Sequence, residues 1–500
     1  MTRRSFLALL AATLLFRLWL AAAVPITGDE AYFIWWGKIP DWGFYDHPPM
    51  VGWWLAALLR VSDAQWWLRL PATLLPGVLA LAAARFLRRH GEDVAWTAAA
   101  LVLLSPLDLW NVFITTDTPL VYFSFFSALA FLRAARDDDW RFYLLSGLLF
   151  SGAVLSKYFA ALLGFAYLLH ALVSPNRKKW LGLLLCYGAT VPALLLMAWW
   201  NAGHCWANVM FNFYNRNTDA AWSWQTPSLY AATLIYVLTP PAIWLLWRRR
   251  GVLPAQWREA ETRALLLTWG APLALFALLS LMKQIGLHWV LSFLPMAFIT
   301  LTLALDTGAR SRLVRWFAGF AALHVALIVA VAQLPLETWR HTRLYDGIVL
   351  TFDAQQLLDR LKPYRADYVF ASDGYSVAST LGYDARRYFL VFGEGSSHAR
   401  QDDILTDFRA EDGRNILILR KGAPAAAGEY APYFRELEIR QIELRGARFT
   451  LVLGRGFIYR AYREGVLAQV RKKYYAIPRW LPQRGCYFCD RYFPGTPCVK

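Results

Sequence analysis

Apolar runs of about twenty residues recur over the first two thirds of the chain, and they leave few folds open. The runs at 5–25, 66–87, 180–200 and 314–334 are each long enough to cross the ~30 Å hydrocarbon core of a bilayer as a helix. The composition agrees, because the 500 residues are 57% hydrophobic and only 17% charged. An ordinary soluble domain has ~45–50% apolar and ~25% charged residues. The sequence therefore predicts a polytopic α-helical membrane protein.

The basic residues indicate how the helices are oriented. The net charge is +17, but Lys and Arg fall mostly in short clusters between apolar runs, such as Arg88-Arg89 and Arg248-Arg249-Arg250. This placement follows the positive-inside rule and argues against a nucleic-acid partner. It predicts a multi-pass membrane protein with its N-terminus in the cytoplasm and its C-terminus on the outer side of the membrane. We expect about eleven transmembrane helices, at 5–25, 66–87, 94–114, 119–135, 142–155, 159–173, 180–200, 228–247, 264–281, 289–305 and 314–334.

The composition changes after residue 336. Segments 368–372 and 415–419 have the pattern of short buried strands. We expect a transmembrane domain over 1–335, including an outer loop at 26–65, and a small extracytoplasmic α/β domain over 336–500. This second domain has no Gly-rich nucleotide-binding fingerprint.

Three cysteines lie near the C-terminus, at Cys486, Cys489 and Cys498. A zinc site would need a fourth ligand, and none is obvious nearby. On the oxidising side of a membrane a disulfide is favoured, ahead of free thiols and of a metal site.

Ionisable and aromatic side chains are concentrated in the loop at 27–54. It carries Asp29, Glu30, Asp46 and His47 among several tryptophans and tyrosines. Acids and a histidine at a membrane surface suit ion binding or proton transfer, and aromatic rings suit a sugar or lipid at the interface. Other polar residues on the same predicted side are Asp117, Lys157, Arg216, Lys283 and His288.

Several short motifs on this side occur in a characteristic order. They are Gly28-Asp29-Glu30-Ala31-Tyr32, Tyr45-Asp46-His47-Pro48-Pro49, Thr116-Asp117-Thr118-Pro119-Leu120, Leu155-Ser156-Lys157 and His288-Trp289. Together they resemble the dolichyl-phosphate-mannose–protein mannosyltransferase family, and most closely its bacterial branch of lipid A aminoarabinose transferases. The resemblance implies a GT-C glycosyltransferase fold and a sugar donor linked to polyprenyl phosphate. It also implies a place in the bacterial inner membrane, with the C-terminal domain in the periplasm. This chain has Asp46-His47 where the aminoarabinose transferases have Glu-Lys, so neither the sugar nor the acceptor carries over.

The resemblance also implies roles for individual residues. Asp29 corresponds to the suspected base or metal ligand, with Glu30 beside it and Asp117 as a second catalytic acid. Asp46 and His47 could hold a divalent metal ion. The expected contacts to the donor phosphate or the substrates are His47, Lys157, Lys283, His288, Tyr45 and Arg216. Such a site would transfer a sugar from undecaprenyl phosphate to an envelope acceptor, which could be lipid A, another lipid-linked glycan or a protein.

Simpler interpretations exist for the same residues. Asp29, Glu30 and Asp117 could cap helices, and Lys157 could extend its amine to the membrane boundary. Arg17 could pair with a neighbouring helix. As a whole, the chain could instead be a flippase of lipid-linked sugars, but a transporter should carry ionisable groups near the middle of several spans. A scaffold would not explain the acids at the outer ends of the spans.

Overall fold

The computed structural model describes residues 1–217, 221–251, 258–422, 426–496 and 498. By their internal contacts, the residues form two compact units. The helical unit comprises Met1–Val24, Ser62–Leu196 and Ala220–Ala332. The mixed unit comprises Pro25–Val61, Met197–Asp219 and Gln333–Lys500. The segment Pro25–Val61 therefore belongs to the same unit as the C-terminal part of the chain.

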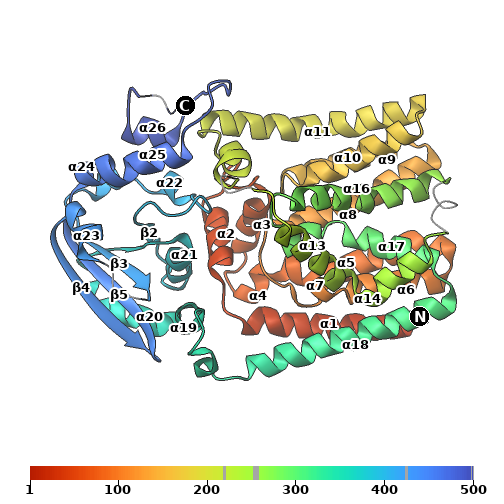
Figure 1. Ribbon diagram of the computed structural model, residues 1–500, viewed down its shortest axis with the longest axis horizontal. Coiled ribbons are helices and arrows are strands. Elements are labelled where there is room, and N and C mark those ends of the chain that lie inside the picture. Colours follow the sequence, from red (N-terminus) through yellow and green to blue (C-terminus); the bar gives the residue numbers. More distant parts are fainter. Residues whose placement is uncertain (218–220, 252–257, 423–425, 497, 499–500) are drawn as a thin grey trace. The chain divides into compact units, whose positions relative to one another are not determined.

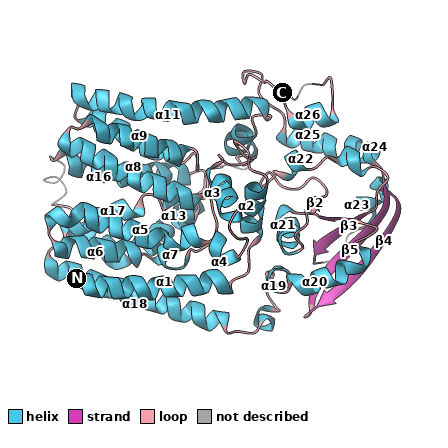
Figure 2. Cartoon of the chain, turned by 180° about the vertical axis from the view of Figure 1, so that it is seen from behind, coloured by secondary structure: helices cyan, strands magenta, loops and turns pink. Residues whose placement is uncertain are grey.

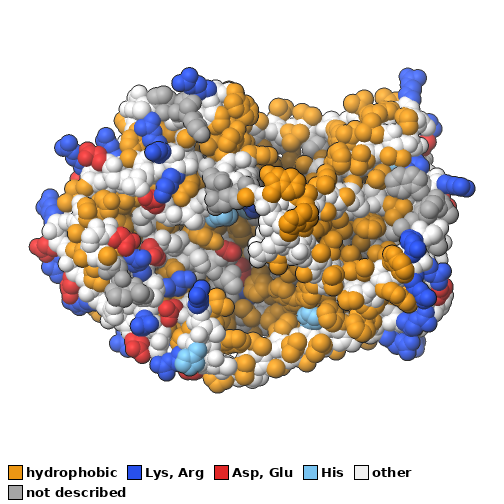
Figure 3. All heavy atoms as spheres, in the orientation of Figure 1, with side chains coloured by type: hydrophobic (Ala, Val, Ile, Leu, Met, Phe, Trp, Pro, Cys, Tyr) orange, Lys and Arg blue, Asp and Glu red, His pale blue; other side chains and the backbone are white. Residues whose placement is uncertain are grey.

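Nearly all of the helical unit is α-helix, and its longer helices lie side by side with similar axis directions (Figure 1). Its helices are α1 (Arg3–Ala23), α4 (Gln65–Leu68), α5 (Leu70–Leu87), α6 (Glu92–Leu103), α7 (Pro106–Trp110), α8 (Asp117–Asp137), α9 (Trp140–Val154), α10 (Ala160–Val173), most of α11 (Arg177–Gly203), α13 (Gln225–Leu238), α14 (Pro240–Arg248), α16 (Ala260–Ser280), α17 (Leu294–Ala304) and α18 (Thr307–Ala332). Side chains such as Leu323 and Leu327 of α18 are more than half exposed. Figure 3 shows apolar side chains covering much of the visible surface of these helices. An apolar outer surface on long helices is what a lipid environment requires.

The number of long helices is lower than the eleven predicted spans. Among the described residues, six helices are long and apolar enough to cross a membrane, and a seventh is added if the bent pair α13 and α14 counts as one. The predicted span at 94–114 is divided between α6 and α7, and α7 starts at Pro106. The pair α13 and α14 is bent by 90°, with Pro240 at the start of α14. Proline interrupts the backbone hydrogen bonds of a helix, whereas an average over apolar residues does not register the break.

Buried polar contacts fasten the helical unit. Arg17 of α1 is 2% exposed and donates hydrogen bonds to four backbone carbonyls, among them those of Thr73 and Asn111 at 2.9 Å each. It therefore pairs with neighbouring helices. Ion pairs also gather where the predicted cytoplasmic loops meet, as between Arg136 and Glu261 at 3.7 Å. Arg310 pairs with Asp93 at 3.4 Å in the same region.

The mixed unit is built on one five-stranded sheet in the order β2-β1-β3-β5-β4. The first three of these strands are parallel, and β5 runs antiparallel to both β3 and β4. The strands are β1 (Val369–Ser372), β2 (Leu390–Val391), β3 (Ile416–Lys421), β4 (Phe434–Leu444) and β5 (Ala447–Phe457). Its helices are α2 (Gly28–Lys38), α3 (Met50–Leu59), α12 (Ala207–Val209), α19 (Tyr345–Phe352), α20 (Ala354–Leu361), α21 (Tyr375–Asp384), α22 (Asp402–Leu405), α23 (Ala427–Tyr430), α24 (Tyr459–Tyr462), α25 (Ala468–Tyr474) and α26 (Tyr487–Tyr492). The sequence prediction of a polytopic helical protein with a small α/β domain near its C-terminus is confirmed.

One face of the sheet carries the core of the mixed unit. Leu417 and Leu419 of β3 pack with Leu451 of β5 against apolar side chains of α19, α20 and α21. Figure 2 shows these three helices along one side of the strands. The central strand β3 begins with four buried apolar residues, as expected for a strand covered on both faces. The edge strand β4 alternates exposed charges with half-buried residues, a pattern that discourages pairing with another chain.

The loop helix α2 packs closely against α21. A Cβ atom added to Gly28 would lie 2.0 Å from Oγ of Ser376 and 2.9 Å from its Cα. No larger residue fits there without moving one of the two helices. Gly28 thus lets the first turn of α2 approach the first turn of α21, and this contact places Asp29 beside the α/β domain.

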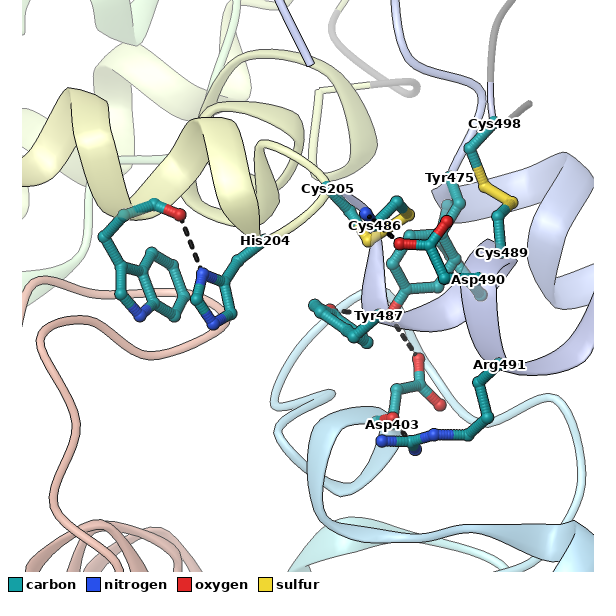
Figure 4. Close-up of a disulfide and its surroundings, with 12 residues drawn as sticks. His204, Cys205, Asp403, Tyr475, Cys486, Tyr487, Cys489, Asp490, Arg491 and Cys498 are labelled. Carbon is teal, nitrogen blue, oxygen red and sulfur yellow. Dashed lines mark hydrogen bonds between the residues drawn. A yellow bond between two sulfur atoms is a disulfide. The ribbon is translucent and has the colours of Figure 1, made fainter. Parts of the chain in front are cut away.

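Two disulfides close the C-terminal tail (Figure 4). Cys489 pairs with Cys498, whereas Cys486 pairs with Cys205, 281 residues earlier in the chain. Backbone hydrogen bonds support the second link, as from N–H of Arg484 to the carbonyl of Ala202 at 2.7 Å. The predicted disulfide chemistry is confirmed, but the partner of Cys486 lies outside the tail.

Candidate active site

The polar cluster of the helical unit joins three of the predicted site residues. Asp117 is the first residue of α8, and Lys157 lies in the turn between α9 and α10. Nζ of Lys157 donates to both carboxylate oxygens of Asp117, at 2.8 and 2.9 Å. Both side chains are less than one tenth exposed, and Nε2 of the half-exposed His288 lies 3.9 Å from Asp117. A buried ion pair beside an accessible imidazole suits binding of an anion and proton transfer at this end of the helices.

Asp29 is the most accessible acid of the predicted site. It lies in the first turn of α2 and is exposed, and its Oδ1 accepts a hydrogen bond of 2.7 Å from the hydroxyl of Tyr375 in α21. Burial raises the pKa of Tyr375, and the charge of Asp29 raises it further. The tyrosine therefore stays protonated and holds one oxygen of the carboxylate. The other oxygen can accept a proton from a substrate hydroxyl.

Glu30 has a structural role that accounts for its burial. Its Oε2 accepts hydrogen bonds from N–H and Oγ1 of Thr27, at 3.0 Å each, and its own N–H donates to Oγ1 of Thr27. This reciprocal pattern is a capping box, which satisfies backbone donors at the start of α2. Glu30 is only 1% exposed, so Asp29 is the acid of this pair that a substrate can reach.

Asp46 lies in a buried network between the loop and the α/β domain. Its Oδ1 accepts a hydrogen bond of 3.2 Å from the hydroxyl of Tyr32, which itself accepts from N–H of Gln401 at 3.1 Å. Burial raises the pKa of Asp46 to about 7, and the charge of Asp29 contributes a small further increase. Asp46 therefore changes its charge near neutral pH.

Three more predicted residues surround this acid. The backbone N–H of Tyr45 donates to Oε1 of Gln401 at 2.8 Å, and its hydroxyl accepts from Asn215 at 3.3 Å. The ring of His47 lies edge-on to Phe211, with centroids 6.4 Å apart. The guanidinium of Arg216 lies 5.3 Å from the centroid of the Phe211 ring. Burial lowers the pKa of Arg216, and the charge of Asp46 partly opposes this shift.

The remaining predictions concern Lys283 and a metal ion. Lys283 follows α16 and is half-buried, and the contacts described above do not include it. Among the described residues, the only group of three Cys, His, Asp or Glu side chains close enough to share an ion is Cys486, Cys489 and Cys498, all of which form disulfides. Asp46 and His47 offer only one carboxylate and one imidazole, so a divalent ion held there would need water or substrate oxygens to complete its coordination.

Sequence reasoning missed the partners supplied by the α/β domain. Tyr375 and Gln401 lie 346 and 369 residues after the side chains they contact, Asp29 and Tyr32. Neither belongs to a motif, and no local pattern marks them. A tyrosine at the start of a helix that follows a buried strand was the only available signal, and it is weak.

The fold of the chain is similar to that of solved structures. The structure of ArnT from Cupriavidus metallidurans bound to undecaprenyl phosphate is similar with a TM-score of 0.61 and 15% sequence identity, over 90% of this chain and 98% of that one. The apo structure of the same protein gives a TM-score of 0.56 and 15% identity, over 89% and 97%. The chain therefore has the GT-C fold and is a multi-pass membrane protein, as the sequence predicts.

Sequence comparisons match parts of the chain. Residues 46–200 match the family model of dolichyl-phosphate-mannose-protein mannosyltransferase. The lipid A galacturonosyltransferase RgtD of Rhizobium johnstonii is 31% identical over 134 residues, which is 26% of this chain. The match spans 28% of the length of that relative. The chain thus resembles GT-C glycosyltransferases both in fold and in the segment that carries Asp46, Asp117 and Lys157.

Proposed function

We propose that this chain is a glycosyltransferase of the inner membrane that moves a sugar from undecaprenyl phosphate to an envelope acceptor on the periplasmic face. The acceptor would be lipid A, another lipid-linked glycan or a protein. The observation that carries the proposal is that residues 46–200, which match the mannosyltransferase model, contain the buried pair of Asp117 and Lys157. The basic clusters at the opposite end of the helices support a periplasmic site by the positive-inside rule.

The chemistry needs a base and a group that stabilises the leaving phosphate. The carboxylate of Asp29 would take the proton of the acceptor hydroxyl, whose oxygen bonds to the anomeric carbon of the sugar. The bond from that carbon to the phosphate oxygen breaks, and polyprenyl phosphate leaves with the electron pair. A lysine ammonium has three donors, and Lys157 gives two to Asp117, so the third can reach a phosphate oxygen. His288 would add a further donor beside it.

The transfer reaction itself is the test. Purified full-length protein in lipid nanodiscs is given radiolabelled undecaprenyl-phosphate sugars and extracted envelope lipids. We expect transfer by the wild type and a loss of at least a hundredfold in Asp29→Asn. Asp41→Asn is the matched control in the same loop, since the Asp41 side chain contacts Trp42 and Trp200 rather than the site, and it should retain activity. Full activity of Asp29→Asn would assign the base to another acid.

Adding the chelator EDTA to the same reaction tests whether transfer requires a divalent ion. Loss of transfer in EDTA that Mg²⁺ or Mn²⁺ restores would support a metal held by Asp46 and His47. Unchanged transfer in EDTA would count against it.

The bent pair α13 and α14 gives a specific reason to retain the flippase as a second candidate, because interrupted helices are also common in transporters. No transfer from any donor, together with movement of a lipid-linked sugar across a sealed vesicle membrane, would favour that function.

A further inference from the structure

A crevice lies at the carboxyl ends of the parallel strands of the mixed unit. The chain leaves β1 through α21 to reach β2 on one side, whereas β3 lies on the other side of β1. The connections after β1 and β3 therefore diverge, and open α/β sheets bind ligands at such a point. The crevice has a volume of 480 Å³, within the ~300–1,000 Å³ usual for ligand sites.

Three loops form its walls. These are residues 373–377 after β1, residues 391–396 and 398–400 at and after the end of β2, and the end of β3 at Lys421. The lining combines apolar surface, including the rings of Tyr375 and Phe392, with hydroxyl, carboxylate, imidazole and backbone groups. Groups of this kind offer both donors and acceptors to a ligand with many hydroxyls.

Three of the four acids that line the crevice have basic partners, and burial raises the pKa of the fourth, Asp402. Arg420 lies 3.0 Å from Asp373 and 2.7 Å from Glu429. Glu394 pairs with Lys473 in the same way. Paired acids keep acceptor lone pairs but present little net charge, so the crevice suits a polyhydroxylated ligand better than a small ion.

One wall of the crevice reaches the proposed base. Tyr375 lines the crevice, and its hydroxyl donates to Asp29 at 2.7 Å. The second wall is tied to the loop as well, because Gln401, which follows it, bonds to Tyr45 and Tyr32. Asp29 itself is not part of the lining, but a ligand hydroxyl that approaches the hydroxyl end of Tyr375 would lie next to the Asp29 carboxylate bonded to it.

We propose that this crevice binds the saccharide part of the acceptor, with the hydroxyl that receives the sugar at the Tyr375 end. This inference rests on the proposed function and names the acceptor of that site as a carbohydrate. Asp29 takes the proton of that hydroxyl, and its oxygen then displaces polyprenyl phosphate from the donor sugar.

Gly374 allows a test that fills the crevice without disturbing the fold. An added Cβ at Gly374 meets no atom within 4 Å, and its φ of −150° is open to any residue. The series Gly374→Ala, Gly374→Leu and Gly374→Phe therefore occupies the crevice step by step. Gly319→Phe is the matched control, because Gly319 also has open space, on the exposed side of α18.

The primary measurement is binding of the de-acylated lipid A disaccharide to full-length protein in nanodiscs, by saturation-transfer NMR and calorimetry. We expect the Kd for the disaccharide to rise with side-chain size and to be at least tenfold above the wild-type value in Gly374→Phe. The Kd of Gly319→Phe should equal that of the wild type. Thermal unfolding, and binding of undecaprenyl phosphate, should be the same in all variants.

Two results would overturn the proposal. One is a wild type that does not bind the disaccharide, and the other is binding in Gly374→Phe within twofold of the wild type. Failure of the proposed function has a different signature, in which no lipid-linked donor is consumed although the disaccharide still binds the crevice.

Discussion

The buried pair of Asp117 and Lys157 allows the strongest test of whether the helical unit holds a functional site or only a structural ion pair. Removing one partner leaves a buried charge without compensation, which costs about 3–5 kcal/mol of unfolding free energy. We therefore expect Asp117→Asn and Lys157→Met each to lose about that much, since both side chains are less than one tenth exposed. The double variant should lose no more stability than either single variant, which corresponds to a coupling energy of about 3 kcal/mol or more.

The transfer activity of the double variant distinguishes a functional site from a purely structural ion pair. If Lys157 contacts the donor phosphate, the double variant will fold but will not transfer sugar. If the pair only fastens α8 to the turn before α10, the double variant will both fold and transfer sugar. Thermal unfolding followed by tryptophan fluorescence and the transfer reaction would be measured on the same nanodisc samples.

The matched control is the exposed pair of Lys178 and Asp138, whose atoms lie 3.5 Å apart with side chains 69% and 40% exposed. Water and salt screen such a pair, so its double-variant cycle should show no measurable coupling. A coupling energy below about 0.5 kcal/mol for Asp117 and Lys157 would refute the reasoning, because a buried pair cannot then be worth more than a screened one.

Three further predictions follow from the mixed unit. Asp46 has a pKa of about 7 in the folded protein against an ordinary value of 3.8, so its contribution to stability is complete below pH 4 and is lost as the pH rises through 7. Thermal unfolding measured from pH 4 to 8 should show this decline in stability, and Asp46→Asn should make the pH dependence flatter. The substitution Cys205→Ser opens a loop that spans 281 residues and should cost about 5.6 kcal/mol by chain entropy, against about 2.6 kcal/mol for Cys489→Ser with its separation of 9. Equal losses of melting temperature in the two variants would contradict this. Gly28→Ala should destabilise the protein by about 1–3 kcal/mol through its clash with Ser376 and reduce transfer, and an unchanged melting temperature would mean that α2 and α21 can separate freely.

Local pattern was enough to predict the class of fold and much of the candidate site in the helical unit. Apolar runs and basic clusters act over a single span, so they indicate helices and their orientation without knowledge of the neighbours. Asp117 and Lys157 were candidates for the same reason, because each lies at the end of an apolar run. The sequence could not predict where a run is interrupted, and the prolines at 106 and 240 divide or bend segments that average as continuous spans.

The tertiary structure alone decided which side chains surround the acids. Tyr375 meets Asp29 only because Gly28 lets α2 pack against a helix nearly 350 residues later. Cys205 meets Cys486 through the same kind of long-range closure, which leaves no trace in the residues on either side. Asp29 and Glu30 show a local effect instead. The two acids are adjacent in the sequence, but the carboxylate of Glu30 is bonded in the capping box of α2 whereas that of Asp29 is exposed. Contacts at such separations depend on how whole elements pack, and burial then sets which carboxylates a substrate can reach.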